Sequence, residues 1–289
     1  MKNMPIVLLA ACAISPIVLP ALSMEATEIW RLDGLQTPES AIYDRANGVI
    51  IVGNMVAMGA DAGEDGFLSL VSSRGEMIEV NWATGFQDPR GMAIVDDKLF
   101  VADNMGFHIV SLADGSPIET VVLEGAAFPN DVTADDEGNV YISDMFGQTI
   151  WRYADGAASI WLGPDDALSF PNGLLAHDGE IIIGSMGADM GDDFTFGTPG
   201  GLYSAPVDGS EVIPIEGATG IGAIDGVAII GGTILFNDNP TGAIYVLEDG
   251  QAIEIANVGA GGADISNFDS IVLVPQLQQG ALIALQLRQ

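Results

Sequence analysis

Short apolar runs rich in Val and Ile alternate with turns rich in Gly, Asp and Asn over most of the chain. Runs of this kind, bounded by turn-forming residues, are typical of β-strands. From residue 28 onward, no stretch repeats its apolar residues with the period of about 3.6 residues that marks an amphipathic helix. The pattern therefore predicts an all-β protein built from many short strands.

These strands belong to a repeat that occurs six times. Each copy opens with a turn, continues with a few small or apolar residues and a tight turn, and ends in a β-branched strand. The copies are PESAIYDRANGVIIVGNM (38–55), PRGMAIVDDKLFVADNM (89–105), PNDVTADDEGNVYISDM (129–145), PNGLLAHDGEIIIGSMG (171–187), IDGVAIIGGTILFNDNP (224–240) and ADISNFDSIVLVPQL (263–277). Most copies run into a further strand, such as TIWRYA (149–154).

The second residue of each opening turn defines a column of equivalent positions: Glu39, Arg90, Asn130, Asn172, Asp225 and Asp264. Successive members are 51, 40, 42, 53 and 39 residues apart. Self-similarity at roughly this spacing, with strand-turn-strand content, is the signature of propeller blades. Six copies predict a six-bladed β-propeller, whose sheets surround a central channel. A two-sheet sandwich or two β domains would be the alternative, which six aligned turns disfavour.

The chain ends are expected to close the ring. The segment EIWRLDG (28–34) precedes the first copy and has a strand-like pattern. We expect it to pair with the C-terminal blade, whose strands are SIVLVP (270–275) and ALIALQL (281–287). This pairing would remove free sheet edges.

Two glycine-rich acidic insertions account for the long intervals. They are MVAMGADAGEDG (55–66) and MGADMGDDFTFGTPG (186–200), and both follow the second strand of their copy. We expect solvated loops on one face of the propeller. A lid over the channel mouth, or a second calcium site without EF-hand spacing, is the alternative.

The first residues differ from the rest of the chain. Lys2 is followed by the apolar segment 6–23, which ends in small residues. This composition predicts a secretory signal peptide at 1–23, a single propeller at 24–289, and export to the periplasm or the extracellular space. The apolar run is short for a membrane anchor and contains two prolines, so we expect no stable membrane insertion of the mature chain. A lipoprotein box ending at Cys12, the sole cysteine, is a minor alternative.

The charge balance limits the partners. The chain has 40 acidic and 8 basic residues, a formal net charge of −32. Such a surface repels nucleic acid and anionic membranes. We therefore expect no nucleic-acid partner, and a small-molecule substrate instead.

The column carries the candidate chemistry. Innermost strands line the axis of a propeller, so these side chains should point together at one mouth of the channel. Three carboxylates and two amide oxygens converging there would repel one another without a cation. Hard oxygen ligands suit Ca²⁺, although another divalent cation would also fit them. The two histidines, His108 and His177, lie outside the column and are expected to be structural.

The six turns resemble those of the SMP-30/gluconolactonase/LRE-like family of calcium-dependent propeller hydrolases. The ordered set Glu39 in PES, Asn130 in FPND, Asn172 in FPNG and Asp225 in IDG carries the resemblance, which covers about residues 30–287. It implies that Glu39, Asn172 and Asp225 hold the metal and that Asn130 contacts metal or substrate. It also implies that Asp225 is the catalytic base. Asp264 would be a further ligand, a supporting group or the partner of Arg90.

The chain departs from the best-known lactonases of that family at Phe128, where they carry an arginine that holds the sugar acid. Arg90, in the neighbouring blade, could instead orient a substrate. The sequence therefore favours an exported, calcium-dependent hydrolase of a lactone or related ester. A non-catalytic propeller scaffold with a structural axial Ca²⁺ is the alternative of a different class.

Overall fold

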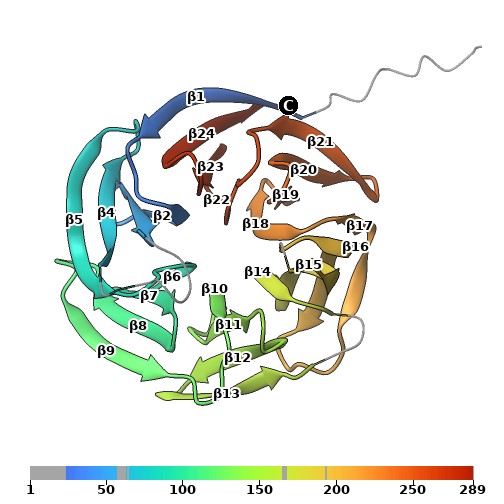
Figure 1. Cartoon of the computed structure of the whole chain (residues 1–289), viewed down its shortest axis with the longest axis horizontal. Coiled ribbons are helices and arrows are strands. Elements are labelled where there is room, and N and C mark those ends of the chain that lie inside the picture. Colours follow the sequence, from blue (N-terminus) through green and yellow to red (C-terminus); the bar gives the residue numbers. More distant parts are fainter. Residues whose placement is uncertain (1–23, 57–62, 64, 165–167, 193, 289) are drawn as a thin grey trace, which may run out of the picture.

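A computed structural model describes residues 24–56, 63, 65–164, 168–192 and 194–288. Six four-stranded antiparallel sheets are arranged around one axis, as Figure 1 shows. The predicted six-bladed β-propeller is confirmed. The predicted signal peptide and Cys12 lie outside the described residues, so both remain predictions.

Five blades are consecutive in the chain. The first three comprise β2 (Pro38–Asp44), β3 (Val49–Asn54), β4 (Gly66–Ser72) and β5 (Met77–Phe86); β6 (Met92–Val95), β7 (Lys98–Asp103), β8 (Gly106–Ser111) and β9 (Pro117–Val122); β10 (Pro129–Ala134), β11 (Val140–Asp144), β12 (Thr149–Ala154) and β13 (Ala157–Leu162). The next two comprise β14 (Pro171–His177), β15 (Glu180–Met190), β16 (Phe196–Pro206) and β17 (Ile213–Gly222); β18 (Ile224–Ile230), β19 (Thr233–Asp238), β20 (Ala243–Glu248) and β21 (Gln251–Asn257).

The sixth blade joins the two ends of the chain. It contains β22 (Ser266–Phe268), β23 (Ile271–Gln276), β24 (Ala281–Arg288) and, as its outer strand, β1 (Glu25–Asp33). β1 pairs antiparallel with β24 along its length, from Glu25 opposite Arg288 to Asp33 opposite Ala281. The predicted closure by the N-terminal strand is confirmed.

The hydrophobic core lies between the blades. Each of the six pairs of neighbouring blades shares its own cluster of buried side chains. Between blades one and two, for example, Ile51 and Leu68 pack against Leu99 and Val101, all fully buried. The Val and Ile runs of the sequence thus supply the apolar side chains that are buried between neighbouring blades.

A β-bulge occurs at the start of four innermost strands. The register shifts between Pro38 and Ala41 in β2, and at the equivalent places in β10, β14 and β18. Each bulge contains a column residue: Glu39, Asn130, Asn172 and Asp225. Because a bulge bends its strand and re-aims side chains, these four residues leave the pleat and turn to the axis.

Close packing around the axis requires glycine at the position after the column residue in three blades. A Cβ atom on Gly173 would overlap the carbonyl of Asp225, and one on Gly226 would overlap the backbone amide of Ile265. A Cβ on Gly91 would overlap the backbone of Asp131. The innermost strands therefore approach one another more closely than side chains would permit.

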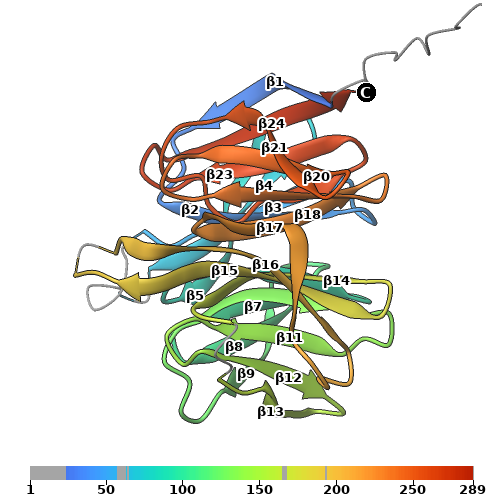
Figure 2. The ribbon, with the colours of Figure 1, turned by 90° about the vertical axis from the view of Figure 1, so that its right-hand side faces the viewer.

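The second acidic insertion is part of a hairpin, so the expectation of a loop is wrong for most of 186–200. β15 and β16 pair from Glu180 opposite Pro206 to Met190 opposite Phe196. Figure 2 shows this hairpin extending beyond one face of the disc. In the first insertion, residues 57–62 and 64 lie outside the described part.

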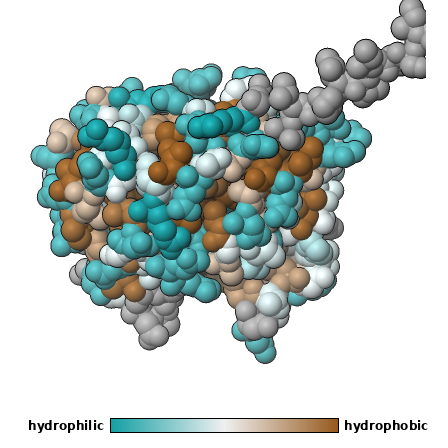
Figure 3. Space-filling view, turned by 90° about the horizontal axis from the view of Figure 1, so that it is seen from above, coloured by the Kyte–Doolittle hydropathy of each residue, from teal (hydrophilic) through white to brown (hydrophobic). Residues whose placement is uncertain are grey.

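The outer wall of the disc mixes hydrophilic and apolar surface. Figure 3, which views the molecule from the side of β1, shows apolar patches separated by hydrophilic residues. Among the described residues there is no helix with the length and apolar character needed to span a membrane.

The close packing at the axis predicts that a Gly→Ala substitution there lowers the stability of the fold more than the same substitution at an open position. Gly173→Ala should destabilise the fold by about 1–3 kcal/mol, because the added methyl meets rigid backbone. The matched control is Gly163→Ala, where a Cβ would meet open space and the change should stay within about 0.5 kcal/mol. Urea unfolding in chelator-containing buffer measures both, and equal stabilities would contradict the packing argument.

Candidate metal centre at the mouth of the channel

Five of the six column residues meet at one mouth of the channel. Their side chains line a pocket of about 650 Å³. They are Glu39, Arg90, Asn130, Asn172 and Asp225, and each residue is between 1% and 5% exposed. One side chain from each of five successive blades is thus brought to the same place.

The sixth column residue occupies a different position. In blade two the amide of Gly91, the residue after the column, donates to the carbonyl of Asn130 in the next blade. The amide of Asp264 donates in the same way to the carbonyl of Glu39, 3.1 Å away. Asp264 is therefore equivalent to Gly91, and Ala263 is the column residue of blade six. The backbone hydrogen bonds correct the sequence alignment by one residue here.

Three column oxygens are buried without a hydrogen-bond partner. They are Glu39 Oε2, Asn130 Oδ1 and Asn172 Oδ1. An unsatisfied buried acceptor costs about 1–3 kcal/mol, so three around one pocket fit a cation that prefers oxygen, such as Ca²⁺. Within the described residues, no three His, Cys, Asp or Glu side chains form a metal-holding group. A cation at this mouth would thus depend on amide oxygens as well as carboxylates.

Methionine sulfurs orient the two column amides. Asn130 Nδ2 lies 3.9 Å from the sulfur of Met145, and Asn172 Nδ2 lies 3.3 Å from that of Met186. Asn172 Nδ2 also donates to Asp225 Oδ1 at 2.7 Å. Because these partners face the nitrogen of each amide, the oxygen is left for the channel.

A second ring of residues surrounds the column, and sequence reasoning missed it. Five members directly follow the second strand of their blade, and Met186 lies within β15; the members are Met55, Asn104, Met145, Met186, Asn239 and Leu277. Asn239 Nδ2 donates to Asp225 Oδ2 at 2.5 Å, whereas Asn104 Oδ1 accepts from Arg90 at 3.0 Å. The ring thus supplies a hydrogen-bond donor beside the carboxylate of Asp225 and an acceptor beside the guanidinium of Arg90. Its sequence signal is the residue 14–16 positions after each column residue.

The carboxyls at the mouth are electrostatically unfavourable in the absence of a cation. Burial raises the pKa of Asp225 to about 6, although hydrogen bonds from Asn239 and Asn172 act in the opposite direction. Burial and repulsion by Asp225 and Asp131 also hold the pKa of Glu39 well above its usual range. Both shifts are expected where negative charge is desolvated and concentrated.

Arg90 is fixed at the edge of the pocket. Its Nε donates to the carbonyl of Pro129 at 2.7 Å, and its Nη1 lies 3.3 Å from Asp88 Oδ2. The guanidinium lies over the ring of Phe128, 4.2 Å from the ring centroid. Its Nη2 is buried without a partner. Arg90 therefore keeps the N–H donors of Nη2 for a group that enters the pocket.

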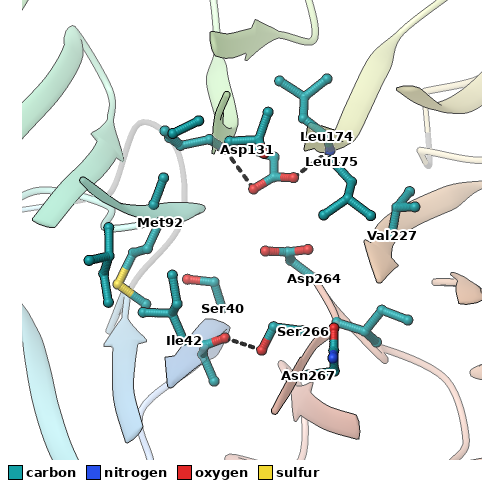
Figure 4. A pocket seen from close by; sticks show the side chains of 17 residues that line it. Ser40, Ile42, Met92, Asp131, Leu174, Leu175, Val227, Asp264, Ser266 and Asn267 are labelled. Atoms are coloured by element: carbon teal, nitrogen blue, oxygen red, sulfur yellow. Dashed lines mark hydrogen bonds between the residues drawn. The ribbon is translucent and has the colours of Figure 1, made fainter. Parts of the chain in front are cut away.

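Asp131 and Asp264 face each other across a separate pocket of about 250 Å³, shown in Figure 4. Asp131 Oδ1 accepts from the amide of Val132 at 2.6 Å, and Oδ2 accepts from that of Leu174 at 2.5 Å. Burial raises the pKa of Asp131 to about 7, and burial together with repulsion from Asp131 raises the pKa of Asp264. The two carboxyls can share a proton, so this pair is satisfied without a cation.

Acidic residues at the ends of second strands anchor the turns that carry the column. Asp103 accepts hydrogen bonds from the backbone amides of Gln87 and Asp88 at 2.9 and 2.7 Å. Asp144 holds the amide of Phe128, and Asp238 holds that of Ala223, each at 2.7 Å. The opening turns of blades two, three and five are therefore positioned by carboxylates from their own blades.

The two histidines lie away from the mouth. His108 Nε2 is 2.9 Å from Asp103 Oδ2, and its Nδ1 is 3.0 Å from the hydroxyl of Thr120. His177 lies 3.3 Å from Asp178, near the surface. Neither lines the pocket that holds the column.

No family model matches the sequence, and no curated protein matches it. Solved structures do share the fold. A gluconolactonase from Xanthomonas campestris, described as important in glucose secondary metabolic pathways, has a TM-score of 0.68 at 15% identity; the match covers 89% of this chain and 88% of that one. A protein of unknown function from Bacteroides thetaiotaomicron has a TM-score of 0.67 at 12% identity, over 92% and 76% of the two chains.

A chain of the nidogen/laminin complex is also similar, with a TM-score of 0.60 at 14% identity over 86% and 87% of the two chains. At these identities the comparisons establish the propeller fold alone. They include an enzyme and a component of a protein complex, so function must be argued from the site.

The anchoring role of Asp103 predicts a pH-dependent stability. Burial by itself would raise the pKa of Asp103, but hydrogen bonds from His108 and from the amides of Asp88, Gln87 and Asn104 outweigh it and lower that pKa. Asp103→Asn should therefore destabilise the protein by about 1–3 kcal/mol at pH 7. The stabilisation is complete above the unfolded pKa of about 3.9 and is lost as the pH falls through the lower folded value.

Denaturant unfolding of the wild type and the Asp103→Asn variant from pH 7 to 3 measures this difference. Asp97→Asn, at an exposed position of the same blade, is the matched control. A penalty that stays constant with pH would contradict the assignment.

Proposed function

We propose that this protein is a calcium-dependent hydrolase of lactones or related esters, with its reaction centre at the channel mouth. The observation that carries the proposal is the set of orphaned oxygens on Glu39, Asn130 and Asn172, beside the carboxylate of Asp225. These four residues would hold the ion, and another divalent cation of similar ligand preference would also fit. When bound, Ca²⁺ supplies positive charge that polarises a carbonyl and stabilises the oxyanion that develops on attack.

Asp225 would act as the general base. Both of its oxygens are held, Oδ1 by Asn172 and Oδ2 by Asn239, so its carboxylate cannot rotate away from the pocket. A base held in this way can take the proton of a water that attacks a carbonyl at the mouth. Asn239 would serve as a positioning residue for that step.

Arg90 would bind an electron-rich part of the substrate through its free Nη2. Its side chain is fixed by Pro129, Asp88 and Asn104, so it loses little conformational entropy when a ligand binds. Asp264 would take no part in metal binding, because it lines the other pocket and is paired with Asp131.

A propeller scaffold without catalytic activity is the second candidate. The chain has Phe128 where lactonases of the resembling family carry a substrate-binding arginine, and one similar solved chain belongs to the nidogen/laminin complex. In this case the ion would only stabilise the channel. The segment 1–23 leads us to infer export of either kind of protein.

Calcium titration of the purified protein by calorimetry tests the metal site. We expect saturable binding of about one ion. Glu39→Gln, which keeps the shape and removes the charge, should weaken it by at least about a hundredfold, because ligand charge tunes calcium affinity. Asp264→Asn is the matched control and should change the affinity by less than about tenfold.

A pH-indicator assay of lactones and esters, with and without chelator, then tests the reaction. Metal-dependent turnover that is lost in Asp225→Asn supports the hydrolase. Calcium binding without turnover of any lactone or ester would favour the scaffold. Absence of calcium binding would refute the metal centre itself.

A further inference from the structure

An aromatic wall of five phenylalanines lies beside the channel mouth, and three of them line its pocket. The five are Phe128, Phe146, Phe170, Phe194 and Phe196, joined by ring contacts with centroid distances from 4.9 to 6.3 Å. Phe128, Phe170 and Phe196 pack on the buried Met145 and Met186, the two methionines that orient the column amides. The wall therefore rests directly on the candidate metal centre.

Three rings of the wall line the open pocket, those of Phe128, Phe146 and Phe194, and the last two are the most exposed. Phe146 and Phe194 both line it, with 40% and 44% of their surface exposed. Their centroids are 6.3 Å apart and their planes are nearly perpendicular. Large aromatic side chains left exposed within a concave site are typical of a binding surface for apolar groups.

Phe194 also has a backbone conformation that is unfavourable for its residue type. Its φ is +61°, in the left-handed region that a bulky side chain rarely adopts. Outliers of this kind cost on the order of 1–3 kcal/mol and concentrate at functional sites. Gly or Asn at this position of the hairpin turn would avoid that cost. The phenyl ring of Phe194 is therefore what the strained position provides.

The wall adds an apolar surface beside the polar column, in blades three and four. Phe146 follows β11, and Phe194 and Phe196 lie on the hairpin of β15 and β16 that extends over this face (Figure 2). The other blades add Asp225 and Asn239 from blade five, Leu277 and Gln278 from blade six and Met55 from blade one. A bound molecule would therefore place its polar group at the column and an apolar group against blades three and four.

We infer that the substrate is a lactone or ester that carries an apolar alkyl or aryl group, bound between Phe146 and Phe194, rather than a polyhydroxylated sugar lactone. This inference rests on the proposed hydrolase. A pocket of about 650 Å³ has room for such a group beside the reacting carbonyl. Polyhydroxylated rings would lose hydrogen bonds to water against the phenyl rings that line the pocket.

Three lactones separate the alternatives: γ-decalactone, which carries an alkyl chain, γ-butyrolactone, which lacks it, and glucono-δ-lactone. The variant combines Phe146→Ala with Phe194→Asn, because Asn tolerates the left-handed backbone. Ile160→Ala, an exposed apolar residue on the outer strand of blade three, is the matched control. Thermal unfolding verifies that all variants are folded.

The wild type should have its highest kcat/KM for γ-decalactone. The double variant should lower the ratio of kcat/KM for γ-decalactone over γ-butyrolactone by about thirtyfold, as expected from the loss of two apolar ring contacts. The Ile160→Ala control should keep that ratio. A preference for glucono-δ-lactone, or an unchanged ratio in the double variant, would overturn the inference.

A binding measurement distinguishes failure of this inference from failure of the proposed reaction. Calorimetry of the calcium-loaded protein compares 4-phenylbutyrate with gluconate, two carboxylates that differ in their apolar part. If no lactone or ester is hydrolysed, the proposed hydrolase function fails. The apolar subsite would still be supported if 4-phenylbutyrate binds at least about tenfold more tightly than gluconate and this preference is lost in the double variant. Equal or weaker binding of 4-phenylbutyrate would refute it.

Discussion

The structure depends on burying oxygen-rich side chains where six strands meet at one axis. Glu39 and Asp225 are almost completely buried at one mouth, with raised pKa values caused by desolvation and, for Glu39, by repulsion from neighbouring carboxyls. Two amide oxygens beside them have no partner. In the proposed function, a divalent cation would pair with all four residues at once and offset these costs. The core between the blades holds the ring together, while the axis carries the polar side chains of the candidate metal centre.

Three local features position the side chains at the mouth of the channel. Bulges turn the column residues out of the pleat, and carboxylates such as Asp144 hold the opening turns by their backbone amides. The second ring then determines how each column side chain is oriented, as Met186 does for Asn172 and Asn239 does for Asp225. Because the blades share the fold but differ in these residues, the side chains at the mouth can change one at a time without altering the fold. The aromatic wall is such a change, concentrated in blades three and four.

Much of this could be predicted from sequence, because a propeller forces each blade to place its turn and strands at matching positions. The column was recognisable in five blades for that reason. It failed at Asp264, because β22 has only three residues and its opening lacks the turn that marks the others; the backbone hydrogen bond to Glu39 determines the register. Asn239 was missed because its partner Asp225 is brought close only by the pairing of β18 with β19. The aromatic wall was missed because its rings come from separate turns and from a hairpin expected as a loop.

A crystal structure of the protein with Ca²⁺ tests the central claim most directly. The account predicts one ion at the mouth, within about 2.3–2.6 Å of oxygens from Glu39, Asn130, Asn172 and Asp225. An ion held by Asp131 and Asp264 instead, or a mouth that stays without an ion at saturating calcium, would contradict it.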